Sequence, residues 1–364
     1  MKYYFKYRFV LPSLKISGGV KEALKLANEI EKIGQGVDFV VMWVSPNELQ
    51  IGAERVTYLS KFKTNARFAL FQFPIIFARF FAQYFFSLRK AEQVGLKNKF
   101  VFTHYSTYPL SLIVPSNYRF FFVQDMEWNF IKNKLLSNLL KTFIIFVYKK
   151  GTVLTANQYL TGEMKKNGIT VHAELPIWAD QQFLAPSNIT RSIDFVMVLR
   201  KGDQKRLDLY LEFIRIVNYQ YKDWRLAIIT PDSELADTLR PLIAECYLKP
   251  SIEEMRSVYA RSKFFLLLSD HEGFGLPPLE AMGAGCVPIC RDAGGIHAYM
   301  SGDLKQFVLP LSFDIQQITQ FANNQIIHNK WIEFSDLAKN IFLSGLTKSN
   351  ERSKNLSEFI SLKE

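Results

Sequence analysis

The sequence has few cysteines, and their positions do not predict disulfides. Cys246, Cys286 and Cys290 are the only three among 364 residues. An odd, sparse set suits a reducing compartment better than a secreted scaffold, which excludes a disulfide-stapled mini-protein. Cys286 and Cys290 lie four positions apart and could form half of a metal site. Because no further His or Cys residues complete four ligands, we interpret both as small core residues and predict no metal.

Several other signals are also missing. The N-terminal residues MKYYFKYRFVLPSLK contain no apolar run of about 7–15 residues followed by small residues, so they do not predict a signal peptide. We find no solenoid repeat and no low-complexity segment. Zinc-finger spacing, an RNP-like aromatic strand and an arginine-rich tail are absent too, which argues against a nucleic-acid partner.

The composition is that of a folded soluble or membrane-surface protein. Hydrophobic residues make up 48% and charged residues 22% of the chain, which fits neither disorder nor a polytopic membrane protein. At about 100–200 residues per domain, the length predicts two domains.

Basic charge is concentrated in the first half of the chain. Residues 1–180 hold 24 Lys and Arg against 12 Asp and Glu, whereas residues 181–364 hold 21 against 22. Such an excess in one domain indicates an anionic partner, and nucleic acid and an anionic lipid surface are the two usual candidates. The missing nucleic-acid motifs favour the lipid surface.

Two apolar segments bear on a lipid surface. Residues 57–90 are rich in Phe, but Arg79 interrupts them, so a transmembrane helix is disfavoured. Residues 131–150 surround an apolar body with lysines, a composition that suits an interfacial helix. The alternative is that both segments are core helices with ordinary solvated lysines, and the sequence favours neither interpretation.

Apolar strands and amphipathic helices alternate along the chain. Residues 4–11, 37–44, 99–103 and 118–123 have the pattern of buried strands, and a second series begins at residue 193. The pattern predicts two successive doubly wound α/β units over residues 1–178 and 190–345, with a helix over 346–364 that packs back on the first. Ligands bind such sheets beyond the carboxyl ends of their strands. His104 and Asp125 follow two predicted strands, although a lone His is more often structural.

The densest chemistry lies in residues 266–295, LLLSDHEGFGLPPLEAMGAGCVPICRDAGG, which predict a buried strand, a glycine turn and a short helix. Gly273 and Gly275 permit close approach of backbone to a ligand, and the start of the helix is a ready anion site. Glu272 and Glu280 are expected beside it. Carboxylates next to backbone N–H groups suit a ligand with hydroxyls and phosphates, such as a nucleotide sugar. Taken alone, the two glutamates are more often helix caps or solvated groups.

The string HEGFGLPPLEAMGAG, with the following Gly-Gly, closely resembles the E-x7-E motif of retaining GT-B glycosyltransferases of family 4. The segment VMVLRKGDQKR is similar to that family's strand end, with Arg200 and Lys205 in the place of its basic pair. The usual glycine before Arg200 is missing, so Lys201 or Arg206 could take over a basic contact. FFVQDMEWNF, which contains Asp125 and Glu127, is similar to a bacterial branch that includes rhamnosyltransferases of surface-polysaccharide assembly.

The resemblance implies a fold of two Rossmann-like domains facing across a cleft, with C-terminal helices. It implies that Arg200 and Lys205 neutralise the donor diphosphate and that His104 and Glu272 contact the transferred sugar. Glu280 would bind the ribose, and Asp125 and Glu127 would contact or support the acceptor. The remaining donor contacts would come from Gly18, Gly19, Leu248, Gly273, Phe274, Gly275 and Leu276.

The expected function is therefore transfer of a hexosyl or deoxyhexosyl unit, with retention, from a nucleotide diphosphate sugar to a glycan or polyprenyl-diphosphate-linked acceptor. Neither a cofactor nor a metal is expected, and the expected location is the cytoplasmic face of an anionic membrane. Two alternatives stay open: a sugar-nucleotide epimerase on the same fold, and a catalytically silent membrane-associated subunit.

Overall fold

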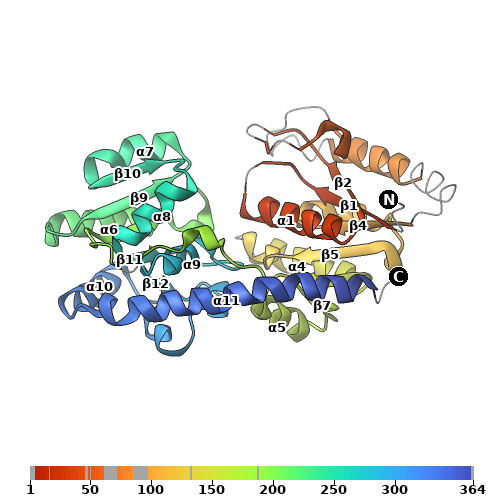
Figure 1. Ribbon diagram of the computed structural model, residues 1–364. Helices are drawn as coiled ribbons and strands as arrows, with labels where there is room; N and C mark the ends of the chain where they lie inside the picture. Colours follow the sequence, from red (N-terminus) through yellow and green to blue (C-terminus); the bar gives the residue numbers. More distant parts are fainter. Residues whose placement is uncertain are drawn as a thin grey trace. The chain divides into compact units, whose positions relative to one another are not determined.

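The computed structural model describes residues 5–15, 17–45, 48–49, 51–60, 72–85, 97–131, 133–186 and 188–361. The chain divides into two compact units (Figure 1). Unit 1 comprises Met1–Ile177 together with Glu351–Glu364, and unit 2 comprises Trp178–Asn350.

Unit 1 is built on a parallel sheet in which seven described strands have the order β3-β2-β1-β4-β5-β6-β7. The strands are β1 (Phe5–Leu11), β2 (Gly36–Val41), β3 (Val56–Tyr58), β4 (Lys97–Phe102), β5 (Arg119–Val123), β6 (Thr152–Thr155) and β7 (Ala173–Glu174). Every residue of β5 is buried, as expected of a central strand covered by helices on both faces.

The helices of unit 1 begin at residues that suit helix starts. Ser17 caps the first helix by accepting a hydrogen bond from the Val20 amide at 3.2 Å, and Asn133 and Asn157 cap two others in the same way. Residues 72–85 are also helical. The remaining helices are α1 (Gly18–Lys32), α3 (Tyr108–Ser111), α4 (Lys134–Tyr148) and α5 (Gln158–Lys166).

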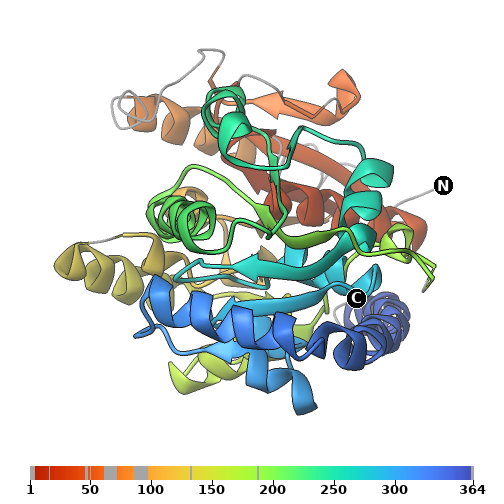
Figure 2. The same ribbon diagram turned by 90° about the vertical axis from the view of Figure 1, so that its left-hand side faces the viewer.

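Unit 2 has a second parallel sheet, in which six described strands have the order β10-β9-β8-β11-β12-β13. Figure 2 shows this sheet from the side of unit 2. Its strands are β8 (Ile193–Val198), β9 (Leu226–Thr230), β10 (Glu245–Leu248), β11 (Ser262–Leu267), β12 (Val287–Arg291) and β13 (Val308–Leu309). Its helices are α6 (Leu207–Gln220), α7 (Ser233–Leu239), α8 (Ile252–Arg261), α9 (Leu276–Gly283) and α10 (Ile315–Ile327). The last helix, α11 (Lys330–Ser361), begins in unit 2 and ends in unit 1.

The expected α/β architecture of two doubly wound sheets is confirmed. The short strands β3 and β13 at the sheet edges were not predicted, because two or three residues carry too little pattern to indicate a strand. Phe183, which lies between the two expected domain ranges 1–178 and 190–345, is buried in unit 2 against Tyr259.

Each apolar segment singled out in the sequence has one buried and one exposed face where it is described. In helix 72–85, Ile76 and Phe80 are buried while Ile75 and Phe81 are exposed. The parts of 57–90 that span 61–71 and 86–90 lie outside the described residues. Over the described ranges, no helix combines the length and apolar character that crossing a bilayer requires.

Candidate functional site

The basic and acidic residues of the candidate site in unit 2 meet beyond the carboxyl ends of β8 and β11. These strands are parallel neighbours, with Phe195 opposite Phe264, so the loops that follow them leave the same edge of the sheet. Lys205 ends the short 3₁₀ turn η6 (Asp203–Lys205) after β8, and Glu272 lies in the loop after β11. The Lys205 Nζ lies 2.8 Å from the Glu272 Oε1. The fold thus brings together two predicted site residues that are 67 positions apart.

Backbone hydrogen bonds hold the loop of Glu272 in place. The Glu272 amide donates to the Ala293 carbonyl at 2.7 Å, and the Gly295 amide donates to the Glu272 carbonyl at 2.8 Å. A Cβ atom on Gly295 would lie only 2.2 Å from the Gly273 carbonyl oxygen. The Gly-Gly that follows the motif therefore serves a close approach between two backbone segments.

The start of α9 depends on a second glycine. Gly275 has a φ of +77°, in the left-handed region that favours glycine, and its carbonyl accepts a 2.6 Å hydrogen bond from the Tyr299 hydroxyl. Phe274 is buried between the rings of Trp178 and Tyr299. Leu276 begins the helix, and because Pro277 and Pro278 have no backbone N–H, the predicted anion donors at this turn are the amides of residues 274–276.

Glu280, on α9, is half-buried, and its charge acts on the hydroxyl of the buried Tyr259 on α8. Burial, and then Glu280, raise the pKa of Tyr259 well above its usual value, whereas the nearby charge of the exposed Arg200 lowers it. Arg200 and Glu280 therefore influence the same buried hydroxyl. Leu248, expected among the donor contacts, ends β10 with 40% of its surface exposed.

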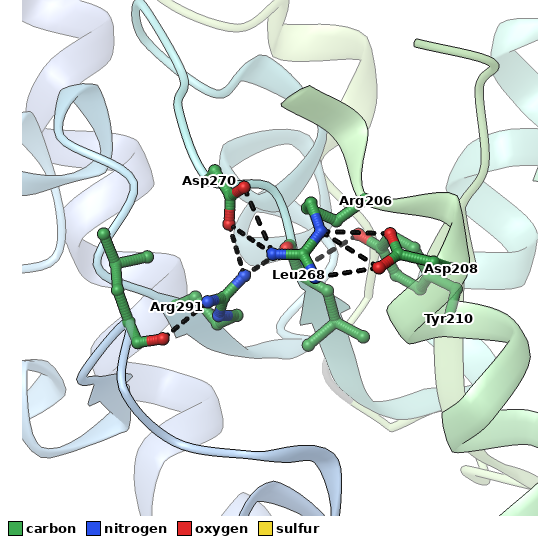
Figure 3. A network of polar contacts seen from close by, with 7 residues as sticks. Arg206, Asp208, Tyr210, Leu268, Asp270 and Arg291 are labelled. Carbon is green, nitrogen blue, oxygen red and sulfur yellow. Dashed lines mark hydrogen bonds and ion pairs between the residues drawn. The ribbon is translucent and has the colours of Figure 1, made fainter. Parts of the chain in front are cut away.

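The two alternative cations are held in ion pairs. Lys201 lies 3.0 Å from Asp232 and 2.7 Å from Glu234, both measured from its Nζ to a carboxylate oxygen. Arg206 forms hydrogen bonds to the carboxylates of Asp208 and Asp270 (Figure 3).

Sequence reasoning missed Asp270 and Arg291. Asp270 lies two residues before Glu272, and its Oδ1 accepts hydrogen bonds from both Arg206 and Arg291 (Figure 3). The signal that could have indicated Asp270 was its position close to Glu272 of the E-x7-E-like motif. Arg291 ends a buried strand, where sequence alone gives no sign of a buried arginine.

The candidate residues of unit 1 also follow strand ends. Gly18 and Gly19 begin α1, and a Cβ atom on Gly19 would lie 3.4 Å from the Gln124 Oε1, just beyond the end of β5. A Cβ atom on Gly18 would meet no atom within 4 Å. The expected Gly-Gly turn therefore lies beside the segment that contains Asp125 and Glu127.

His104 and Glu127 are linked through one turn of backbone. The His104 Nδ1 accepts a 3.3 Å hydrogen bond from the Ser106 amide, and the Glu127 Oε1 accepts a 3.0 Å bond from the Tyr105 amide. Burial lowers the pKa of His104 to about 4 and raises that of Glu127 to about 8. Both side chains are therefore mainly uncharged at pH 7.

Asp125 has a different environment from Glu127. Its Oδ1 accepts a hydrogen bond from the Met126 amide at 2.7 Å, and its side chain is only partly buried. Burial of Glu127 follows from its packing beside Tyr108 and Tyr148, whose buried hydroxyls form a 2.7 Å hydrogen bond with each other. Only Asp125 of the two carboxylates is accessible for a direct contact.

The described residues contain no group of three or more His, Cys, Asp or Glu side chains placed to hold a metal ion. Cys286 and Cys290 are free and buried, and burial raises the pKa of the Cys286 thiol to about 12.

Comparison with known sequences finds similarity over part of unit 2. Residues 181–335 match the sequence model of the glycosyl transferases group 1. The GDP-mannose:cellobiosyl-diphosphopolyprenol alpha-mannosyltransferase of Komagataeibacter xylinus is 37% identical over 94 residues, which are 23% of this chain and 24% of that protein. The enzyme of the same name from Xanthomonas oryzae is 41% identical over 78 residues, 19% and 20% of the two chains. The matched region thus spans about a quarter of the relatives' length.

Solved structures show a likeness over nearly the whole chain. Sucrose-phosphate synthase from Thermosynechococcus elongatus matches with a TM-score of 0.67 at 11% identity, covering 98% of this chain and 96% of that one. The Anabaena protein Alr3699/HepE, solved in complex with UDP-glucose, matches with a TM-score of 0.67 at 12% identity over 98% and 99%. The chain therefore has the GT-B fold, and its residues 181–335, which hold Arg200, Lys205, Glu272 and Glu280, match the sequence model of the glycosyl transferases group 1.

Proposed function

We propose that the chain is a retaining glycosyltransferase that moves a hexosyl or deoxyhexosyl unit from a nucleotide diphosphate sugar to a polyprenyl-diphosphate-linked acceptor. The observation that carries the proposal is the 2.8 Å contact between the Lys205 Nζ and the Glu272 Oε1. Glu272 lies in the loop that leads directly into the start of α9. Cationic and anionic groups side by side suit a ligand with phosphates at one end and hydroxyls at the other. The match of residues 181–335 to the glycosyl transferases group 1 supports it.

The pair has a simple chemical role in this proposal. In the free protein the two charges neutralise each other, which keeps both side chains in place before the donor arrives. When the donor binds, Lys205 turns to the phosphate oxygens and Glu272 to the hydroxyls of the sugar. Arg200 and the backbone N–H groups of residues 274–276, at the turn into α9, add positive potential where charge develops on the leaving diphosphate. Glu280 binds the ribose, and no metal ion is part of the proposal.

Unit 1 contributes uncharged groups. His104 accepts a hydrogen bond at Nδ1, which leaves the proton of its neutral ring on Nε2 for a sugar hydroxyl. Gly18 and Gly19 approach the donor, Asp125 contacts the acceptor, and Glu127 supports the turn of His104. Retention follows the family resemblance, with the leaving phosphate taking the proton of the attacking hydroxyl on the same face of the sugar.

The relatives suggest the first substrates to test. Two of them are named as enzymes that use GDP-mannose and a cellobiosyl-diphosphopolyprenol. We therefore propose GDP-mannose as the first donor and a disaccharide on a polyprenyl diphosphate as the first acceptor. Such an acceptor places the reaction at the membrane surface and in surface-polysaccharide assembly.

Helix α4 supports contact with an anionic membrane. Leu135, Leu139 and Phe146 are exposed by 70%, 59% and 47%, and their spacing puts them on one face of the helix. Lys134 and Lys141 lie together on one side of this face, and the Lys150 Nζ lies 4.1 Å from the centre of the Phe146 ring. An exposed apolar face with lysines beside it fits the boundary between headgroups and acyl chains of the inner leaflet.

Thermal unfolding with GDP, UDP, dTDP, ADP and CMP tests the donor site. A nucleotide that binds only the folded chain raises the unfolding temperature. At a hundredfold excess over its Kd, it adds about 2.7 kcal/mol to the free energy of unfolding. We expect one nucleoside diphosphate to act in this way without added divalent metal. If none does, the donor site is contradicted.

Transfer of labelled mannose from GDP-mannose to the lipid-linked acceptor tests the reaction. We expect Lys205→Ala and Glu272→Gln to lower the rate by about a hundredfold or more. Asp194→Asn is the matched control, because the Asp194 ion pair with Lys263 joins the start of β8 to β11, at the opposite edge of the same sheet. An inverted anomeric configuration in the product would contradict retention.

Flotation with anionic liposomes tests the membrane contact. We expect the wild-type chain to float at low salt and to dissociate as salt rises, because salt screens the lysines. Leu135→Ser combined with Leu139→Ser should weaken flotation, whereas Tyr219→Ser, at an 80% exposed residue of unit 2, should not. Equal flotation of the three proteins would exclude α4 as the contact.

A further inference from the structure

Asp270 lies between two arginines that come from different parts of unit 2 (Figure 3). Its Oδ1 accepts a 3.0 Å hydrogen bond from the Nη1 of Arg206 and a 2.6 Å hydrogen bond from the Nη1 of Arg291. Arg206 follows Lys205 directly, and Asp270 precedes Glu272 by two positions. Two members of the cluster are therefore close in sequence to the pair proposed to bind the donor.

Arg206 has a backbone conformation that needs support. It adopts φ +48° and ψ +50°, a left-handed conformation that costs a residue other than glycine about 1–2 kcal/mol. Its guanidinium is held on both sides, by Asp208 at distances of 2.8–3.2 Å and by Asp270 at 3.0 and 3.2 Å. These contacts offset the strain and fix the point at which η6 turns into α6.

Arg291 anchors Asp270 from the other side. Its side chain is only 5% exposed, and it also donates to the Leu268 carbonyl at 3.2 Å and the Leu311 carbonyl at 2.6 Å. A buried guanidinium that loses its carboxylate partner is left with an uncompensated charge. Asp270 is therefore held firmly where β12 meets the loop after β11.

Two further hydrogen bonds tie the same loops. The Asp270 amide donates to the Gln204 carbonyl at 2.9 Å, one residue before Lys205. The Leu268 amide donates to the hydroxyl of Tyr210, in the first turn of α6, at 2.8 Å. The loop that carries Glu272 and the turn that carries Lys205 are thus joined through side chains and backbone.

From this geometry we infer that Asp270 is a positioning residue that sets the separation of Lys205 and Glu272 through Arg206 and Arg291. The inference rests on the proposed function, since it assigns Asp270 to the donor site of that reaction. Asp270 acts through the two arginines and itself contacts no substrate. Its loss should therefore displace Lys205 from the leaving group and leave the ligating groups themselves intact.

Kinetics of Asp270→Asn test the inference, because this change keeps the shape of the side chain and removes its charge. We expect kcat for transfer to fall by about tenfold to a hundredfold, with a smaller change in the KM for the donor, since misplaced charge affects the transition state most. Asp194→Asn breaks an ion pair in the same sheet and should leave kcat unchanged. Asp270→Glu, which keeps the charge, should restore part of the rate.

A double-mutant cycle separates positioning from a general loss of structure. If Asp270 acts through Lys205, Asp270→Asn should have little further effect on kcat in a Lys205→Ala background. Independent effects that multiply in the double variant would overturn the inference. A kcat for Asp270→Asn within about twofold of the wild type would overturn it as well.

Hydrogen exchange gives a readout that does not depend on activity. Asp270→Asn should speed amide exchange in residues 203–209 and 268–275, because both segments lose the same tie, whereas Asp194→Asn should not. Unchanged exchange in these segments would overturn the inference while leaving the proposed function untouched. Conversely, if Asp270→Asn speeds exchange but the wild-type chain transfers no sugar, the proposed function is contradicted. The link that Asp270 forms between the two segments is then still supported.

Discussion

The candidate site edges of the two units hold their chemical groups in opposite ways. In unit 2, Lys205, Glu272 and Arg206 are all in ion pairs, and each retains some exposure to solvent. In unit 1, burial dominates, and it shifts the pKa of His104 downwards and that of Glu127 upwards, so that both stay mainly uncharged at pH 7. The groups of the first edge are charged and balanced, whereas the buried His104 and Glu127 of the second are mainly uncharged.

The difference fits two kinds of ligand chemistry. Partly exposed ion pairs can exchange one partner for an anionic ligand without leaving a charge unpaired in a low-dielectric interior. A buried, uncharged edge offers hydrogen bonds and aromatic surface, as with the rings of His104 and Tyr105, whose centres lie 4.4 Å apart. Phosphates suit the first environment and sugar hydroxyls the second.

The largest effect is expected from a change to the backbone contact in unit 2. In Gly295→Ala, the new Cβ atom would lie 2.2 Å from a backbone oxygen, which cannot move aside as a flexible side chain could. We expect a loss of stability of about 4 kcal/mol or more. Denaturant unfolding measures it, and a variant as stable as the wild type would show that the loop of Glu272 can relax.

The second prediction tests whether a buried ion pair away from the site edge contributes to the stability of unit 1. Arg352, in α11, is 3% exposed and pairs with Glu22 at 3.0 Å and Glu29 at 2.8 Å, both on α1. Arg352→Met should cost about 3–5 kcal/mol of stability, because it leaves the buried Glu22 without this partner. Adding Glu22→Gln should recover part of that loss.

A matched exposed pair provides the control for Arg352. Lys354 and Glu358 lie on the same helix, with side chains exposed by 75% and 62%. Lys354→Met should change the free energy of unfolding by under about 0.5 kcal/mol. Equal effects at positions 352 and 354 would show that burial does not decide the strength of these pairs.

The third prediction concerns pH and the neutral edge of unit 1. The pKa of Glu127 is raised to about 8 from its ordinary value of 4.5, so the folded chain keeps a proton that the unfolded chain releases. Its contribution to stability is full below pH 4.5 and is lost as pH rises towards 8, at up to about 1.4 kcal/mol per pH unit. Glu127→Gln removes this dependence.

Urea unfolding at several pH values measures the effect. The stability of Glu127→Gln relative to the wild type should rise between pH 5 and 8, and a flat difference would contradict the buried neutral carboxyl. The pKa of His104, lowered to about 4, has the opposite sign. The unfolded chain binds its proton first, so stability is lost as pH falls from about 6.5 to 4.

The smallest effect is expected at Gly18, where a Cβ atom has open space and the helix begins. Gly18→Ala should raise stability by up to about 1 kcal/mol, because alanine loses less backbone freedom in a helix. If Gly18→Ala is as stable as the wild type but binds the donor more weakly, the absence of a side chain at Gly18 serves contact with the ligand. Unchanged binding and transfer would make Gly18 an ordinary helix start.

The parts of the fold that sequence reasoning predicted share a local cause. Buried parallel strands such as β5, with the sequence RFFFV, are recognisable from a run of apolar residues alone. The exposed apolar face of α4 was not decided by composition, because a core helix and an interfacial helix have the same content of Leu, Ile and Phe. Which face is covered depends on neighbouring elements, and only the tertiary structure supplies them.

The sequence by itself determined two doubly wound sheets and the turn around Glu272, because hydrophobic periodicity and glycine requirements are local properties. The tertiary structure decided that Arg206 pairs with Asp270, 64 positions away. It also decided that Arg291 is buried against Asp270 and that burial keeps Glu127 protonated at neutral pH. Ion pairing and pKa depend on distances across 20 to 60 or more positions of the chain and on the exclusion of water, which no local pattern of residues encodes.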